Sequence, residues 1–526
     1  MLLVSLMLAM FVSGLNQSVV ATATPKMLAD LGGFELLPWV FTVYLLSSTV
    51  CTPLVGKLSD IYGRKVFLLG GIALFVLASA GCGAAMSMPM LIAFRVLQGL
   101  GGGTIMACVV ASIGDLFPPA ERGKYIGLFV GTMTMSALVG PAIGGLLTDH
   151  VSWRACFYVN VPVAALAMTA IWINLPSKQR SGKRRKIDYA GAMLLSAATT
   201  TALLALTWAH RAYGWESPQT ISMIIAALVL LAGFIAQERR HPEAILPPEI
   251  FRSREFVVGS VLTILFGAAT QGTVQYLPTF VQTAMQGSAT ASGLVTTPQS
   301  LAMLLTSVVG GQVLSRTGRY KVQVMLGVSL TLSGTIMLQT LNVGDPSWHI
   351  AIFMVFMGLG SGLVMPTMSV ITQNAVSHEM MGVVTAARQF SMQIGAVTGV
   401  AVFGAVLASS YESSFSSEIG PEASAAIGTD VLEKFHDPTL ALNQREFAIV
   451  QEEVRGLDDG EALLASAVSA QQEGVASAVR DIYRGAAAVV FLALLSAVFL
   501  RELPLRKRGE TSVVEPASPR TATAEG

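Results

Sequence analysis

The chain has 526 residues, of which 53% are hydrophobic and only 12% are charged, and its formal net charge is +1. A soluble protein of this length needs more charge to cover its surface, so most of the exterior must face lipid. The balanced charge leaves no basic surface for nucleic acid, and four cysteines without a Cys-x-x-Cys pair predict neither a disulfide framework nor a metal site.

Apolar segments follow one another along the chain, and fourteen of them are long enough to cross a bilayer, which takes roughly 20 residues. They lie at 2–24, 37–56, 66–85, 89–113, 124–147, 155–175, 188–207, 219–237, 256–278, 292–314, 322–342, 349–374, 383–408 and 485–500. The chain is therefore predicted to be an all-α membrane protein, and the even number of spans puts both termini on the same side.

Lys and Arg residues gather in the loops on one side of the predicted spans. Six of them fall in PSKQRSGKRRK at 176–186, whereas the short loops on the other side hold only Lys26, Arg154 and Arg211. The positive-inside rule therefore predicts a protein of the cytoplasmic membrane with both termini in the cytoplasm. Ala21-Thr22-Ala23 is the alternative signal of a cleaved leader, but no basic residues precede its apolar run, and cleavage would reverse the agreement with charge.

One loop occurs twice, because GKLSDIYGRK at 56–65 returns as GQVLSRTGRY at 311–320 with two glycines and an arginine in common. The repeat predicts two six-helix halves with two helices inserted between them. The predicted parts are an N-terminal half at 1–175, a segment with a basic loop and the inserted helices at 176–254, a C-terminal half at 255–500, and a cytoplasmic tail at 501–526. Repeated halves around a site near the midplane are typical of secondary transporters.

The segment at 409–484 is the one sizeable polar stretch, and it is strongly acidic. Its richness in Ser, Ala and Gly argues against an independent folded core. We expect a solvated extracellular loop; a lid, or a vestibule that attracts cations, is the alternative.

Three motifs combine glycines with charged or kinking residues. GKLSDIYGRK at 56–65 allows a tight turn at its glycines and carries an acid that can cap a helix end or pair with a base. RVLQGLGGG at 95–103 puts Arg95 and Gln98 on one face of a span, where a charge normally faces the protein interior. GPAIGG at 140–145 gives a face of small residues with a proline kink, which lets helices approach closely.

In this order, the three motifs resemble those of the major facilitator superfamily, in particular its fourteen-spanner drug:proton antiporter branch of the EmrB/QacA type. The resemblance implies a secondary transporter with the major facilitator fold, which exports drugs or other amphiphilic small molecules in exchange for protons by alternating access. It implies a latch in the signature loop, coupling or gating by the fourth helix, and a seal and hinge in the fifth. The residues concerned are Gly56, Asp60, Gly63, Arg64 and Lys65 for the latch, Arg95 and Gln98 for coupling, and Gly140, Pro141, Gly144 and Gly145 for the antiporter motif. An ordinary capped loop, an arginine satisfied by carbonyl groups and generic helix packing are the alternatives.

No sequence motif indicates an enzymatic function or a bound cofactor. No H-x-x-x-H or G-x-S-x-G element supplies a metal site or a nucleophile, so we do not expect an enzyme. No G-x-x-x-x-G-K-[ST] run is present, so no cofactor is expected and the energy would come from the proton gradient and potential. We expect a monomer embedded in the lipid bilayer.

The chain departs from the antiporter branch in its first helix, where that branch usually carries a membrane-embedded Asp and this chain has Asn16. An amide cannot titrate. Proton coupling would then depend on carboxylates near the rim, with Asp30, Glu35 and Asp115 as the candidates. The loss of a central carboxylate weakens the case for dications and favours neutral, amphipathic or anionic cargo. The rival function is export of a lipid or an endogenous metabolite by the same fold, without proton coupling.

Several polar side chains inside the spans are candidates for the substrate cavity. Pairs of glutamines four residues apart lie on one face of a helix and need hydrogen-bond partners in lipid. The candidates are Asn16, Gln17, Tyr44, Gln271, Gln275, Tyr276, Gln299, Gln389 and Gln393. Hydrogen bonding between helices explains them about as well as substrate binding does.

Overall fold

The computed structural model describes the chain except for residues 1, 32–35, 176–187, 209–213, 215, 242–243, 288, 377–379, 437, 439, 441–443 and 503–526. The N-terminal half comprises α1 (Leu2–Leu31), α2 (Leu37–Tyr62), α3 (Arg64–Gly83), α4 (Met88–Leu116), α5 (Pro119–His150), α6 (Ala155–Tyr158) and α7 (Asn160–Asn174). The inserted pair is α8 (Tyr189–Trp208) and α9 (Pro218–Glu238).

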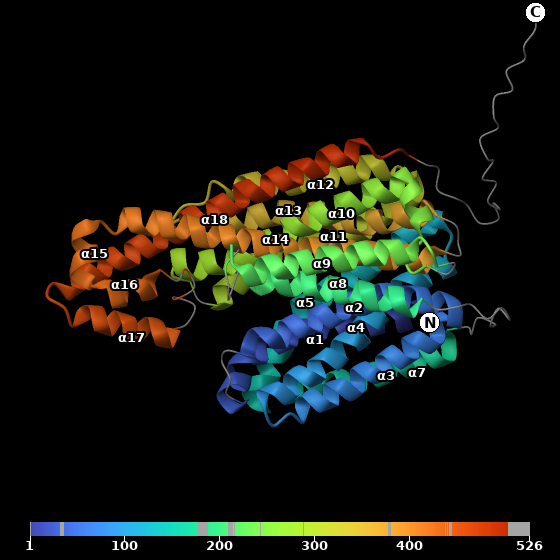
Figure 1. Cartoon of the computed structure of the whole chain (residues 1–526), viewed down its shortest axis with the longest axis horizontal. Coiled ribbons are helices and arrows are strands. Elements are labelled where there is room, and N and C mark those ends of the chain that lie inside the picture. Colours follow the sequence, from blue (N-terminus) through green and yellow to red (C-terminus); the bar gives the residue numbers. More distant parts are fainter. Residues whose placement is uncertain are drawn as a thin grey trace, which may run out of the picture.

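The C-terminal half follows a short 3-10 turn, η3 (Pro248–Arg252). It comprises α10 (Arg254–Thr279) with its π-helical end η4 (Phe280–Ala284), α11 (Ala289–Thr317), α12 (Tyr320–Leu338), α13 (Ser347–Asn374), α14 (Met381–Glu418) and α18 (Gly460–Val498). Three short helices lie between α14 and α18, namely α15 (Pro421–Ile427), α16 (Thr429–Phe435) and α17 (Gln444–Arg455). Figure 1 shows the two halves side by side with α8 and α9 between them.

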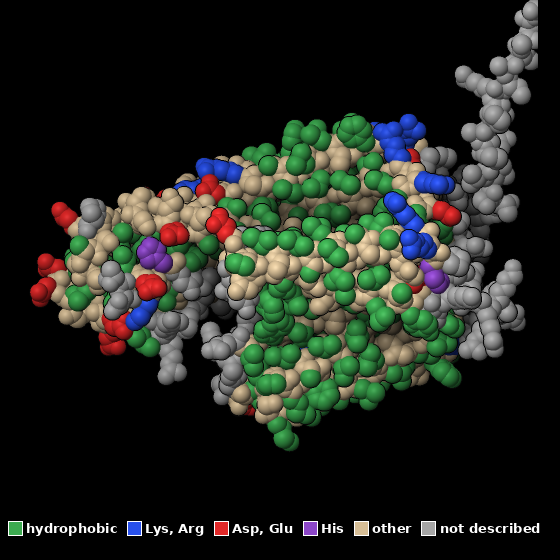
Figure 2. All heavy atoms as spheres, in the orientation of Figure 1, with side chains coloured by type: hydrophobic (Ala, Val, Ile, Leu, Met, Phe, Trp, Pro, Cys, Tyr) green, Lys and Arg blue, Asp and Glu red, His purple; other side chains and the backbone are tan. Residues whose placement is uncertain are grey.

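The predicted spans are confirmed, because fourteen helices of the described chain are long and apolar enough to cross a membrane. Apolar side chains cover the middle of the bundle in Figure 2, as lipid contact requires. A group of Lys and Arg side chains lies at one end, and Asp and Glu gather over α15–α17 at the other. We call these the basic end and the acidic end; the basic end holds the α2–α3 turn at Gly63 and the start of α14.

The acidic segment at 409–484 differs from the solvated loop that we expected. α14 and α18 continue well beyond the predicted spans, with 38 and 39 residues, and the short helices pack against these extensions. Tyr411 Oη donates to the Phe435 carbonyl oxygen at 2.6 Å, and the Phe415 and Phe435 rings stack 6.3 Å apart. The core is therefore a continuation of the bundle's core, which the polar composition of the segment concealed.

The two halves meet mainly along α5 with α11 and α2 with α14, with further contacts of α5 with α13 and of α4 with α14, and α8 packs against both α2 and α14. Glycines permit the closest approaches. A Cβ added at Gly311 of α11 would clash with the Gly123 carbonyl oxygen of α5, and one at Gly56 of α2 would lie 2.5 Å from the Ala386 Cβ of α14. These contacts lie near the basic end, so the halves are sealed together there.

Substituting Gly311→Ala should open this seal. Overpacking costs about 1–3 kcal/mol, so water access to Ser307, which is buried and lies against Gly127 of the other half, should rise. A cysteine substituted at Ser307 should then react at least about fivefold faster with a soluble thiol reagent.

The matched control is Gly70→Ala, because an added Cβ there meets nothing within 4 Å. Equal reactivity in both variants would contradict the assignment of the seal.

Candidate functional site

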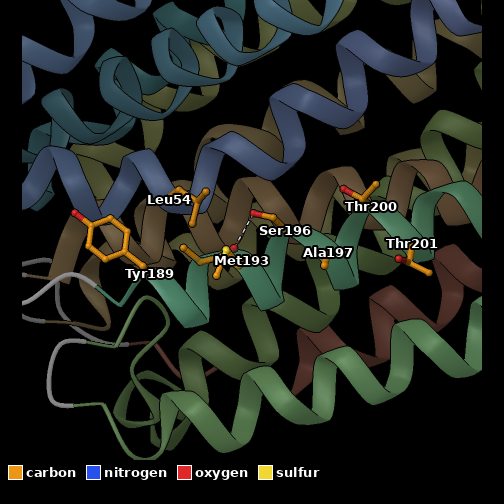
Figure 3. A pocket seen from close by; sticks show the side chains of 8 residues that line it. Leu54, Tyr189, Met193, Ser196, Ala197, Thr200 and Thr201 are labelled. Atoms are coloured by element: carbon orange, nitrogen blue, oxygen red, sulfur yellow. Dashed lines mark hydrogen bonds between the residues drawn. The ribbon is translucent and has the colours of Figure 1, made fainter.

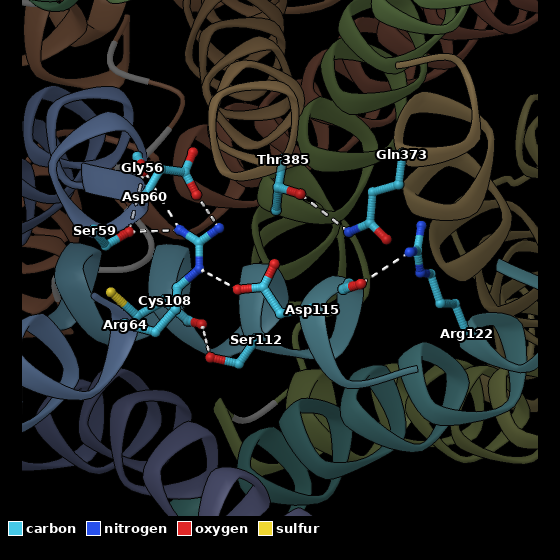
Figure 4. Close-up of polar contacts among 11 residues, drawn as sticks. Gly56, Ser59, Asp60, Arg64, Cys108, Ser112, Asp115, Arg122, Gln373 and Thr385 are labelled. Carbon is cyan, nitrogen blue, oxygen red and sulfur yellow. Dashed lines mark hydrogen bonds and ion pairs between the residues drawn. The ribbon is translucent and has the colours of Figure 1, made fainter. Parts of the chain in front are cut away.

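The signature loop places a buried arginine at the base of the seal (Figure 4). Gly63 has φ +102°, a backbone conformation that favours glycine, and the turn makes Arg64 the first residue of α3. The Arg64 guanidinium donates from Nε to Asp115 Oδ2 at 3.0 Å and from Nη1 to Ser59 Oγ at 2.7 Å, and it also pairs with Asp60. One side chain therefore holds α2, α3 and α4 together.

Asp60 also meets the other half of the protein. Its carboxylate lies against Gly382, the second residue of α14, where a Cβ would clash with both carboxylate oxygens and with Arg64 Nη1. The start of a helix carries a partial positive charge, which favours a carboxylate there. The Arg64 cluster, consisting of Ser59, Asp60, Arg64 and Asp115, is thereby joined to α14 across the seal.

Two further polar residues lie at the basic end, and the sequence analysis did not single them out. Arg122 of α5 donates from Nε to the Phe117 carbonyl at 2.9 Å and from Nη2 to the Gly114 carbonyl at 2.8 Å, so it caps the end of α4. Gln373 of α13 donates to Thr385 Oγ1 of α14 at 3.0 Å. Arg122 carried a signal, a base directly after Pro-Pro-Ala-Glu at a helix start, but it was indistinguishable from other bases of the loops.

A second polar network lies inside the N-terminal half. Arg95, with a relative exposure of 1%, donates from Nε to the Val40 carbonyl at 2.9 Å and from Nη1 to Gln98 Oε1 at 2.7 Å. The Tyr44 ring lies 4.4 Å from its guanidinium carbon. Gln98 in turn donates to Ser79 Oγ at 2.6 Å. Neutral groups thus satisfy the buried charge, as its position within the membrane requires.

Asn16 belongs to the same network. Its Oδ1 accepts from Gln98 Nε2 at 3.1 Å and from Asn160 Nδ2 at 3.2 Å, and the side chain is fully buried. The structure therefore places Asn16 and Tyr44 among the helices of one half rather than on an open wall. Ser79 and Asn160 were missed, although Asn160 is a polar residue near the start of a predicted span.

The antiporter motif lies where α5 packs on α1. A Cβ at Gly140 would clash with the Ser18 side chain, and the Gly144 carbonyl accepts a weak hydrogen bond from Cys156 Sγ at 3.6 Å. Pro141 is exposed, and a Cβ at Gly145 would meet nothing within 4 Å. Gly140 thus serves close packing within one half.

The rim candidates for proton coupling lie in different surroundings. Trp153 Nε1 and Arg154 Nη1 donate to Asp30 Oδ2 at 2.8 and 2.9 Å, and these contacts hold the pKa of Asp30 below its ordinary value. Asp30 therefore keeps its charge at neutral pH. Asp115 belongs to the Arg64 cluster, and Glu35 lies outside the described residues. Lys65 faces away from the seal, since its Nζ donates to the Trp172 carbonyl of α7 at 2.7 Å.

The remaining cavity candidates divide by exposure. Gln17, Gln271 and Gln275 are exposed, and Gln299, Gln389 and Gln393 are half-buried. Gln393 of α14 accepts a hydrogen bond from Thr49 Oγ1 of α2 and so joins the two halves. Gln389 Oε1 accepts from Arg388 Nη2 of the same helix at 3.2 Å. Tyr276 Oη donates to the Val400 carbonyl at 2.6 Å, within the C-terminal half.

Known proteins resemble the chain in sequence and in fold. It is 36% identical over 407 residues to the multidrug transporter protein MdtP of Bacillus subtilis (strain 168), over 77% of this chain and 75% of that protein. It is 32% identical over 401 residues to multidrug resistance protein 3 of the same organism, over 76% of this chain and 78% of that protein.

The crystal structure of the human organic anion transporter MFSD10 has the same fold, with a TM-score of 0.59, 14% identity and coverage of 94% of this chain and 98% of that one. Residues 6–400 match the sequence profile of the Major Facilitator Superfamily. The fourteen spans fit its fourteen-spanner drug antiporter branch. The chain is therefore a multi-pass membrane transporter that belongs to the major facilitator superfamily.

Proposed function

We propose that the chain exports small amphiphilic molecules across the cytoplasmic membrane in exchange for protons, by alternating access between its two halves. Relatives over three quarters of the chain are named as multidrug transporters. The observation that carries the proposal is the seal at the basic end, which joins α2 to α14 and α5 to α11. A carrier needs such a seal at one end while its other end admits or releases cargo.

The direction of the seal follows from charge. The positive-inside rule assigns the basic end to the cytoplasm. The halves are then closed toward the cytoplasm, and the Arg64 cluster with Gly382 of α14 is the latch that must part before cargo can enter from that side.

The nature of the cargo follows from the charges buried within the halves. Arg95 and Arg388 are both buried, and their described hydrogen bonds go to neutral acceptors. Asn16 adds no negative charge. A positive interior disfavours dications, so neutral, amphipathic or anionic molecules are the favoured cargo.

The amide at position 16 also supports the rival function, which is export of a lipid or an endogenous metabolite without proton coupling. Asn16 stands where the antiporter branch usually has a titratable acid, and the pKa of Asp30 is held low. The two functions differ in whether flux of cargo moves protons.

Purified protein in liposomes with an imposed pH gradient should separate these functions. With proton antiport, particular amphiphiles should dissipate the gradient, as recorded by a trapped pH-sensitive dye. Protein-dependent flux of labelled compound without any pH response would overturn proton antiport and favour the rival function.

Substituting Asp60→Asn should reduce this flux at least about tenfold. Removing one partner of a buried ion pair costs about 3–5 kcal/mol, and ~1.4 kcal/mol already changes an equilibrium tenfold. Membrane insertion should stay intact, since Asp60 lies at a helix end. The control is Glu249→Gln, an exposed carboxylate in η3; normal flux in Asp60→Asn would contradict the latch.

Substituting Asn16→Asp should create or steepen a pH dependence for cationic cargo, because it introduces a titratable group into the Arg95 network. The measurement is efflux of a lipophilic cation from liposomes as a function of pH. An unchanged pH profile would mean that this network does not act on the cargo.

A further inference from the structure

The inserted helices lie over the seam between the two halves. α8 contacts α2 of one half and α14 of the other, and α2 and α14 contact each other at the seal. The repeat does not explain the inserted pair, so its position on the seam calls for a role of its own.

Two carboxylates are buried where this pair reaches the basic end. Asp188, 2% exposed, precedes α8; its Oδ1 accepts from the Gly191 amide at 2.8 Å and from Gln237 Nε2 at 3.0 Å. Glu238, 4% exposed, ends α9; its two oxygens accept from the amides of Ile245 at 3.1 Å and Leu246 at 2.9 Å. Both acids are thus fixed by the backbone of the inserted segment.

The two carboxylates lie next to each other. A Cβ at Gly191 would stand 2.5 Å from Asp188 Oδ2 and 3.0 Å from Glu238 Oε1, so these two oxygens are separated by no more than the sum of those distances. Asp188 Oδ2 is buried and has no hydrogen-bond partner in the described chain. This unpartnered oxygen therefore lies close to the second acid.

A small cavity lies between Asp188 and α2. Its volume is about 200 Å³, and its charged lining groups are Asp188 and Lys57. Leu54, Tyr189 and Ala192 line both this cavity and a larger groove of about 630 Å³ between α2 and α8 (Figure 3). Asp188 and Lys57 therefore border the same space.

The neighbours of the pair come from four elements. From α2, Lys57 acts on Glu238 through its charge. From α8 comes Tyr189 at the cavity, and from α14 the apolar Phe390 packs nearby. After α9, Arg239 and Arg240 are exposed and His241 is half-buried.

Where two buried carboxylates lie this close together, the negative charge of one opposes ionisation of the other, so binding of a single proton by the pair is favoured. Gain of the proton from water turns one carboxylate into a carboxylic acid, and no other bond changes. The attraction between the pair and Lys57 then weakens.

We propose that Asp188 and Glu238 form a proton-binding site on the inserted helices that controls the seal between α2 and α14. Without the proton, the doubly charged pair attracts Lys57, which directly follows Gly56 in the seal, and holds α2 in its closed position. With the proton bound, α2 is released and the basic end opens more readily. The assignment of this end to the cytoplasm rests on the proposed function.

The site is tested in two steps, the first of which does not involve transport. Infrared titration of the whole protein should record the C=O stretch of a protonated carboxyl that persists to neutral pH. The band should disappear in Asp188→Asn and in Glu238→Gln, and it should remain in Glu249→Gln, whose carboxylate is exposed. Asparagine still accepts a hydrogen bond as a helix cap, so Asp188→Asn keeps the local fold.

The second step measures the seal. Labelling of a cysteine substituted at Ser307, relative to one at the exposed Thr317, should rise at least about fivefold on acidification, the lower end of couplings between sites. Asp188→Asn should abolish the rise, and Glu249→Gln should keep it.

Three results would overturn the proposal: no infrared band in the unaltered protein, a band that survives in both Asp188→Asn and Glu238→Gln, or labelling at position 307 that does not respond to pH. If any of these results is found while a pH gradient still drives flux of cargo, the proposed function stands. If the band and the pH-dependent labelling are found but a pH gradient drives no flux, proton antiport is refuted. The assignment of Asp188 and Glu238 as a proton-binding site then remains supported.

Discussion

The interior of a bilayer offers no water to a polar group, and the arrangement of this protein depends on that constraint. Arg95 is tolerated because a carbonyl, a glutamine and an aromatic ring surround it, and the glutamine is in turn held by Asn16 and Ser79. Where helices must approach without polar partners, glycines let their backbones meet, as at Gly311 against Gly123. Apart from Arg95 and Arg388, which are buried inside the bundle, the charged groups described above lie toward its two ends.

The basic end combines polar partners around a buried charge with glycine contacts between helices. Arg64 ties three helices of one half together, and Asp60 reaches the positive start of α14 in the other. This contact between the halves depends on a single carboxylate. An apolar seam of the same area would have no such single point at which a change of charge or position releases it.

Much of this architecture could be predicted from the sequence, because span length, charge asymmetry and glycine spacing are local properties. The fourteen spans and the membership of the superfamily follow from such patterns. The sequence placed Gln98 on the same face as Arg95, but the further members of this network could not be predicted, since Ser79 and Asn160 come from other helices that only packing brings together. The core around Phe435 was missed because its apolar residues are spread thinly over acidic helices, and the adjacency of Asp188 and Glu238 depends on how α9 packs against α8.

α14 runs without a break from Gly382 at the latch to Glu418 among the acidic helices. Its 38 residues span about 57 Å at 1.5 Å per residue. Because the helix is continuous, any rotation that moves its first turn away from Asp60 must also displace α15 and its neighbours at the other end. Movement of the acidic end therefore follows movement of the contact between Gly382 and Asp60, and a molecule that clamps α15–α17 would restrain that contact from the opposite end of the bundle.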